Sequence, residues 1–267
     1  MRTLRHQLHL LLPEPQRRLT QPLIKPPIKH LNKPLNKLWA ALLLFACSVV
    51  YSAAAPEYET RARHDPDGIG KFYLGREIAH VMGPGGVPWL ERPEREIEER
   101  PQQLIDALQI QPGQTIADLG AGSGYYSFRI APLVGERGKV LAIDVEPRML
   151  QIISERATRS GVKNVTPVRS TARDPNLPAN SVDLLFMVDV YHELEFPFET
   201  MVKVREALKP GGRVALIEYR EEDPAVMIKP VHKMSERQII RELTTVGFRH
   251  LKTVRTLPLQ HLVIFEK

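Results

Sequence analysis

The stretch IADLGAGSGYY, residues 116–126, places three glycines within five positions directly after an apolar run that ends in an acid. A strand that runs into a glycine-rich turn and then a helix presents free backbone N–H groups and a helix N-terminus to a ligand. A dinucleotide fingerprint, GxGxxG, would need glycine at position 125, which is Tyr125. Asp118, two places before the first glycine, suits a ligand with an ammonium group better than a pyrophosphate. The glycines instead have a GxGxG spacing, at Gly120, Gly122 and Gly124.

Short apolar runs alternate with segments of helical period after this stretch, a pattern typical of a parallel sheet with crossover helices. The runs that predict strands are residues 115–120, 139–145, 165–170, 182–190 and 213–219. The segments FRHLKTVRTLP and QHLVIFEK predict two closing strands, joined by a tight turn, that form an antiparallel C-terminal edge. The sequence therefore predicts an α/β fold with a doubly wound, mostly parallel sheet of seven strands.

Several segments have the apolar spacing of helices. Pro101 suits the first position of a short helix, whose inward residues would be Leu104, Ile105 and Leu108. Two later helices are predicted from apolar faces, one made of Met149, Ile152, Ile153 and Ala157 and the other of Met201, Val204 and Leu208. Ser235 and Gln238 have the spacing of a capping box, which predicts a helix from there through Gly247.

Four motifs together resemble one enzyme family. DLGAGSG (118–124) resembles the first motif of class I S-adenosylmethionine-dependent methyltransferases. The segments VLAIDVEPRML (140–150), SVDLLFMVDVYHEL (181–194) and LKPGGRVALIEY (208–219) resemble later motifs in the family's order. The resemblance covers about residues 100–267 and is to type 11-like, exported bacterial members. It implies the seven-stranded, Rossmann-like methyltransferase fold and S-adenosylmethionine as cofactor.

The resemblance also implies which residues hold the cofactor. Asp144 falls where the family's acid takes the ribose hydroxyls, 24 residues after Gly120, against about 20 in such folds. The family often has an acid near the adenine after the third strand, where this chain has Thr171, and Asp174 is either its substitute or part of the loop. The implied set is Asp118, Gly120, Gly122, Ser123, Gly124, Asp144, Val145, Thr171, Ala172 and Asp189.

The candidate catalytic side chains follow the fourth predicted strand, in VDVYHEL (188–194), where parallel sheets gather their ligands. His192 is the first candidate for a base or acceptor contact, because its proton exchanges near neutral pH. The alternative is a histidine with a structural hydrogen bond. Glu193 and Tyr191 are further candidates, and weaker ones are Glu218, Tyr219, His232 and Lys233. No CxxC pair, HExxH motif or spaced carboxylate cluster predicts a metal.

The acceptor is expected to be a small molecule, since the chain lacks the Asn-Pro-Pro-aromatic tetrad of methyltransferases that act on nucleic-acid bases or protein amides. Three alternatives stay open. They are a catalytically silent protein that binds the cofactor, a nicotinamide-dependent oxidoreductase, and a nucleic-acid-binding protein. The charge argues against nucleic-acid binding. The whole chain has a net charge of +6, but residues 1–37 alone carry +7, so residues 38–267 have a net charge of −1.

The first 55 residues indicate where the protein is located in the cell rather than how it folds. Residues 1–37 are basic and proline-rich, and we expect them to be disordered. Residues 38–55 are apolar and end in three alanines, which predicts a cleaved export signal or a membrane anchor. We therefore expect a periplasmic or inner-membrane-anchored protein, or a cytoplasmic one if the leader is misread, with membrane contact only through an uncleaved 38–55. Residues 56–100 would form a cap and residues 101–267 the methyltransferase domain.

Overall fold

The computed structural model describes residues 57–267. The predicted disordered leader (1–37) and the predicted signal or anchor (38–55) lie outside the described residues, so export and membrane contact stay predictions. Within 57–267, no helix combines the length and the apolar character that crossing a bilayer requires.

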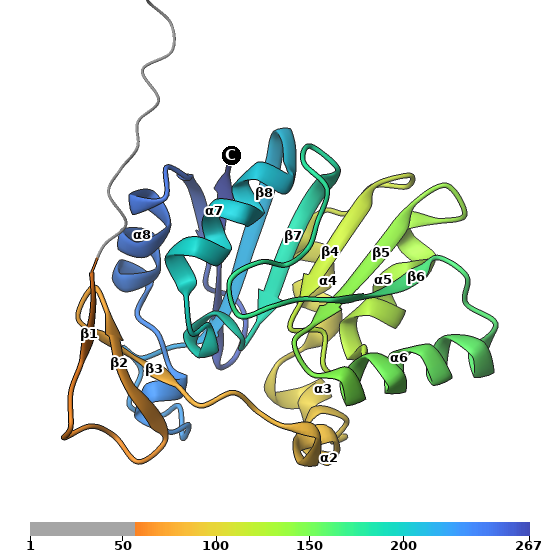
Figure 1. Ribbon diagram of the computed structural model, residues 1–267. Helices are drawn as coiled ribbons and strands as arrows, with labels where there is room; N and C mark the ends of the chain where they lie inside the picture. Colours follow the sequence, from red (N-terminus) through yellow and green to blue (C-terminus); the bar gives the residue numbers. More distant parts are fainter. Residues whose placement is uncertain (1–56) are drawn as a thin grey trace, which may run out of the picture. The chain divides into compact units, whose positions relative to one another are not determined.

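A seven-stranded sheet forms the centre of the described part, in the order β6-β5-β4-β7-β8-β10-β9. β4 through β8 run parallel, and β10 is antiparallel to both β8 and β9. The predicted α/β fold with a mostly parallel sheet is thus confirmed (Figure 1). The strands are β4 (Thr115–Leu119), β5 (Lys139–Asp144), β6 (Val165–Arg169), β7 (Val182–Val188), β8 (Leu208–Tyr219), β9 (Arg249–Val254) and β10 (Gln260–Glu266).

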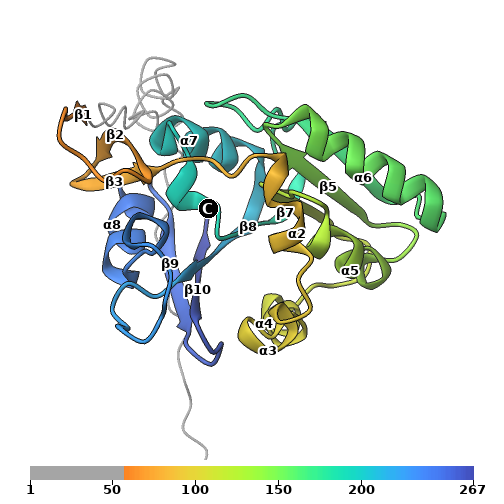
Figure 2. The same ribbon diagram turned by 90° about the horizontal axis from the view of Figure 1, so that it is seen from below.

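Helices cover both faces of this sheet (Figures 1 and 2). One core packs α4 (Pro101–Leu108), α5 (Tyr125–Val134) and Ile153 of α6 (Pro147–Ser160) against residues such as Ile116, Leu184 and Ile264. The other packs α7 (Pro197–Ala207) and α8 (Glu236–Thr245) against Leu185, Leu216 and Phe265. Because β4, β5 and β7 are covered on both sides, they need near-continuous apolar sequence, which is what made them predictable.

The predicted helix at Pro101 is α4, and its inward residues Leu104, Ile105 and Leu108 are all buried. The fifth predicted strand was too short, because β8 begins at Leu208 and not at residue 213. Leu208, which was predicted to lie on a helical face with Met201 and Val204, is instead the first residue of β8. It still packs in the same core as those two residues. That outcome follows from the sheet, where Leu208 pairs with Val182 of β7.

The predicted capping box was wrong. Ser235 does precede α8 with extended backbone, but its side chain makes no capping hydrogen bond. Gln238 instead donates through Nε2 to the carbonyl of Leu74 (3.2 Å) and to Glu242 Oε1 (2.9 Å). The side chain of Gln238, which the capping box would have used, is thus engaged in a tertiary contact. The helix ends at Thr245, two residues before the predicted end at Gly247.

Residues 58–79 form a small antiparallel sheet, β1 (Tyr58–Thr60), β2 (Gly68–Tyr73) and β3 (Arg76–Ala79), which the sequence did not predict. The chain then passes below the carboxyl ends of the parallel strands to the short helices α2 (Val87–Leu90) and α3 (Arg95–Glu98) (Figures 1 and 2). An ion pair joins this segment to the main fold, since Arg76 donates to both carboxylate oxygens of Glu242 on α8, at 2.8 and 3.0 Å.

Candidate active site

A cavity of about 610 Å³ lies at the carboxyl ends of β4, β5, β7 and β8. This volume falls within the roughly 300–1,000 Å³ usual for small-molecule and cofactor sites. Of the predicted site residues, the lining includes Gly120, Gly122, Asp144, Val145, Thr171, Ala172, Asp189, His192 and Glu193. It does not include Asp118, Ser123, Gly124 or Tyr191.

The glycine loop after β4 lies on the cavity wall with its backbone in the left-handed region. Gly120 and Gly122 have φ of +76° and +55°, which L side chains rarely adopt. A Cβ on Gly120 would meet both methyls of Val190 at 2.5 Å, and one on Gly122 would meet Leu90 Cδ1 at 2.7 Å. Glycine is therefore required here by both backbone conformation and close approach.

Asp144, at the end of β5, is bound to that loop. Its Oδ2 accepts a hydrogen bond from the backbone N–H of Gly122, and its Oδ1 accepts one from the N–H of Glu146, both at 2.8 Å. Burial raises the pKa of Asp144, and these two backbone hydrogen bonds partly offset that rise. A carboxylate oxygen has a second lone pair, so each can still accept a hydroxyl donor from the cavity.

Asp118 faces away from the cavity. Its Oδ2 accepts a hydrogen bond of 2.6 Å from the Ser127 hydroxyl on α5, and the residue is 3% exposed. Strand alternation explains this position, because Asp118 shares a face of β4 with Ile116, which packs in the α4–α5 core. The structure therefore places Asp118 as a buried support of the loop rather than in the cavity lining.

Burial raises the pKa of Asp118 to about 7, from about 3.9 for a free aspartate. Between these values the folded chain binds a proton that the unfolded chain has lost, so this residue lowers stability as pH rises from about 4 to 7. We expect Asp118→Asn to gain about 2–4 kcal/mol of unfolding free energy relative to wild type on going from pH 4.5 to 8. Urea unfolding at both pH values measures this difference. Parallel pH dependence of the two proteins would contradict it, and Asp106→Asn, on the exposed side of α4, is the control.

The loop after β6 carries the predicted adenine contacts. Thr171 and Ala172 line the cavity, but the Thr171 hydroxyl already accepts from the N–H of Asp174 at 3.0 Å. Thr171 N–H in turn donates to the carbonyl of Asp174 at 2.8 Å. Asp174 thus closes a turn and lies outside the cavity lining.

Asp189 follows β7 with a left-handed φ of +54° and lines the cavity. Gln260 of β10 donates to its Oδ2 at 2.6 Å, while its Oδ1 is buried without a hydrogen-bond partner among the described residues. Burial raises the pKa of Asp189 well above its ordinary value, and the nearby carboxylates of Glu99 and Glu218 raise it further. This oxygen is left free to accept a hydrogen bond from a donor at the cavity wall.

A charged cluster that the sequence did not predict completes this end of the cavity. Arg95 Nε donates to Glu99 at 2.6 Å and Arg92 Nη2 donates to it at 3.0 Å. The Tyr219 hydroxyl donates to the same Glu99 carboxylate at 3.1 Å. Arg92, Arg95 and Glu99 come from the segment before the glycine motif. Their role in the cavity is visible only in the folded chain, where this segment lies beside the end of β8.

His192 lies in a 3₁₀ turn, η2 (Tyr191–Glu193), directly after β7. Its Nδ1 lies 2.6 Å from Glu218 Oε2, and both side chains are at most 2% exposed. Burial lowers the pKa of His192, but the charge and hydrogen bond of Glu218 outweigh burial and raise that pKa above its ordinary value. Glu218 also accepts a hydrogen bond from the backbone N–H of Tyr191 at 2.9 Å. Glu218, a weaker candidate in the sequence, therefore orients His192, the first candidate.

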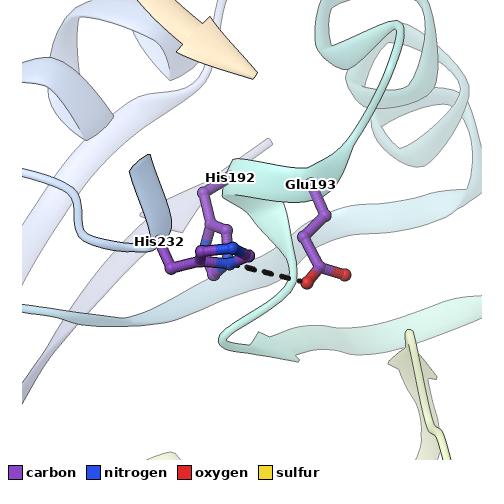
Figure 3. A group of neighbouring side chains, drawn as sticks. All are labelled: His192, Glu193 and His232. Atoms are coloured by element: carbon purple, nitrogen blue, oxygen red, sulfur yellow. Dashed lines mark hydrogen bonds and ion pairs between the residues drawn. The ribbon is translucent and has the colours of Figure 1, made fainter. Parts of the chain in front are cut away.

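Tyr191 was predicted to be a catalytic candidate, yet its side chain is fully buried in the core that also contains Met234 and Leu243. Glu193 does reach the cavity, and burial raises its pKa to about 7. His232, from the turn η3 (Pro230–His232), also lines the cavity, and burial together with the neighbouring His192 lowers its pKa to about 4. Figure 3 shows His192, Glu193 and His232 converging from η2 and η3.

The comparisons with known proteins agree with this geometry. A family model described as a methyltransferase domain matches residues 110–249, which is just over half of the chain. The chain belongs to this family. The match contains the glycine loop, Asp144 and His192, whereas the segment with Arg92 and Arg95 precedes it.

Curated relatives include the ubiquinone/menaquinone biosynthesis C-methyltransferases UbiE of Vibrio cholerae and Escherichia coli, each 28% identical over 144 residues. These alignments cover 54% of this chain and 54% and 56% of the relatives. The chain therefore spans about half the length of the curated relatives it matches.

Among solved structures, a SAM-dependent methyltransferase from Aquifex aeolicus matches with a TM-score of 0.66 and 28% identity, over 70% of this chain and 99% of that one. The [4+2]-cyclase SpnF matches with a TM-score of 0.53 and 16% identity, over 62% of this chain and 80% of that one. The second likeness concerns the fold alone, and it shows that this fold is not confined to one reaction.

Proposed function

We propose that the cavity binds S-adenosylmethionine and that the chain transfers its methyl group to a small-molecule acceptor. The observation that carries the proposal is the pairing of Asp144 with Gly122, because it puts a carboxylate beside a stretch of backbone without side chains on one wall of the cavity. The sulfonium of the cofactor supplies an already activated methyl group, so the protein mainly has to align an acceptor and exclude water.

The residues present fit the two ends of this cofactor. Asp144 would accept from the ribose hydroxyls, with Val145 and Met149 as apolar contacts and Thr171 and Ala172 toward the adenine. The orphaned Oδ1 of Asp189 would accept from the ammonium group of the methionine part. The guanidinium groups of Arg92 and Arg95 would take its carboxylate.

The acceptor side of the cavity lies around the His192 cluster. Val81, Met82, Met227 and Ile228 give the cavity apolar lining, and Glu195 and Lys229 add charged groups to it. The apolar part of this lining favours an acceptor with an apolar body. The charge of −1 after residue 37 gives no support to a nucleic-acid acceptor.

Calorimetry of the full-length chain with S-adenosylhomocysteine tests the proposal. We expect Asp144→Ala to weaken binding about 10–100-fold, since it removes a charged acceptor worth about 1.5–3 kcal/mol. Asp144→Asn, which keeps one oxygen acceptor, should lose less, and Asp106→Ala should bind as wild type does.

Binding of NADH in place of S-adenosylhomocysteine would reject the proposal in favour of an oxidoreductase. Equal affinities of wild type and Asp144→Ala would reject the placement of the ribose. Tight binding without turnover across a broad panel of acceptors would favour the silent cofactor-binding alternative.

A further inference from the structure

Three potential metal ligands from two separate turns meet on the acceptor side of the cavity. His192 Nε2 lies 3.1 Å from His232 Nδ1, and Glu193 Oε1 lies 3.9 Å from the first and 3.8 Å from the second (Figure 3). Within residues 57–267, no other group of three His, Cys, Asp or Glu side chains has its ligand atoms this close together.

These separations match the edges of a coordination polyhedron. A metal bound at about 2.0–2.2 Å in tetrahedral geometry holds its ligand atoms about 3.4 Å apart. The observed distances of 3.1, 3.8 and 3.9 Å lie on both sides of that value, so shifts of a few tenths of an ångström would suffice.

Neighbouring groups already orient two of the three ligands. Glu218 holds Nδ1 of His192 at 2.6 Å, and when His192 is neutral and donates that N–H, the lone pair lies on Nε2, facing His232. The backbone N–H of Met82 donates to Glu193 Oε2 at 3.3 Å and leaves Oε1 facing the two imidazoles. A carboxylate behind a ligating histidine is a common arrangement in metal sites, where it fixes the ring and raises its basicity.

We propose that His192, Glu193 and His232 bind one divalent transition-metal ion, with a coordination position open to the cavity. Two imidazoles and one carboxylate suit Zn²⁺ or Fe²⁺, whereas Mg²⁺ and Ca²⁺ prefer oxygen ligands. The sequence predicted no metal, because His192 and Glu193 are adjacent while His232 lies 40 residues later and no motif spacing connects them.

The open position indicates an acceptor class, and this step rests on the proposed function. An acceptor hydroxyl or thiol bound there would lose its proton to solvent more readily, since a metal lowers the pKa of an oxygen or sulfur ligand. The site therefore favours O- or S-methylation of an acceptor with an ionisable group.

The test is calorimetry with Zn²⁺ on the full-length chain, stripped with chelator and freed of any affinity tag. We expect one Zn²⁺ per chain with micromolar or tighter affinity, weakened at least about 10-fold by His232→Ala and by Glu193→Gln. The matched controls, His80→Ala and Glu136→Gln, change exposed side chains and should bind Zn²⁺ as wild type does. Co²⁺ in place of Zn²⁺ should give the visible absorption of a four- or five-coordinate ion, which His232→Ala should remove.

Absence of saturable Zn²⁺ binding would overturn the inference, and so would wild-type affinity in both ligand variants. S-adenosylhomocysteine titration of the same samples separates this inference from the proposed function. Zn²⁺ binding without S-adenosylhomocysteine binding would leave the metal site standing and reject the methyltransferase proposal, and the reverse result would do the opposite.

Discussion

Replacing Gly122 by valine should reduce S-adenosylhomocysteine affinity by at least about 100-fold, the largest effect we expect at the cofactor site. Valine at φ +55° is strained, because β-branched side chains rarely adopt the left-handed region. Its Cβ would also meet Leu90 Cδ1 at 2.7 Å, so the added methyl groups would enter the cavity or displace its N-terminal wall. Calorimetry gives the affinity, and thermal unfolding reports any loss of stability.

Gly211→Val is the matched control for this variant. Gly211 has φ +73°, yet a Cβ there meets no atom within 4 Å, and the residue lies outside the cavity lining. It should therefore lose stability through backbone strain but keep its affinity for S-adenosylhomocysteine. If Gly122→Val binds within about threefold of wild type, the glycine loop does not contact the ligand.

Arg76→Ala should lower the free energy of unfolding by about 3–5 kcal/mol, the largest stability effect that the structure predicts. Glu242 has no exposed side-chain surface, and Arg76 supplies its two charged hydrogen bonds. After the substitution Glu242 would keep only the amide of Gln238, at 2.9 Å, and a buried charge without a cationic partner is costly. Urea denaturation measures this loss, which would be a large share of the roughly 5–15 kcal/mol typical of a domain.

The double variant Arg76→Met with Glu242→Leu separates charge burial from general disruption. Apolar side chains of similar size often replace a buried ion pair at little cost, so this variant should recover most of the lost stability. A double variant as unstable as Arg76→Ala would mean that the unpaired carboxylate is not the cause, and that the loss comes from packing around β3 or from the hydrogen bonds that Arg76 donates to the carbonyls of Glu77 and His192.

The parallel strands could be predicted because burial on both faces leaves a signal in the sequence itself. Ala142 and Leu185 lie in strands whose residues are apolar in continuous runs, and the turn after β4 needs glycine at Gly120 because of its positive φ and its close approach to Val190. The small sheet of β1, β2 and β3 could not be predicted in this way. Its strands are short and partly exposed, and a long-range ion pair helps to hold it against α8.

The candidate site likewise contains residues that could be predicted from the sequence and residues that could not. Asp144 and His192 follow strand ends, and parallel strands bring such residues to one edge. Which way a side chain points was less certain, since Asp118 and Tyr191 are also near strand ends but face the two cores. Arg95 carries no local signal, and His232 was only a weak candidate, because each reaches the cavity only through the folded arrangement of distant segments.

The match to the methyltransferase family begins at residue 110, but one wall of the cavity is formed by residues 81–99, which come before the match in the sequence. Glu91 links that wall to the glycine loop by accepting from the hydroxyl of Ser123 at 2.5 Å and from Arg156 at 2.9 Å. The wall of residues 81–99 and the wall that holds the glycine loop and Asp144 are thus encoded in separate stretches of the chain. Evolution can therefore change Val81 or Met82, and with them the apolar surface of one wall, without altering Gly122 or Asp144.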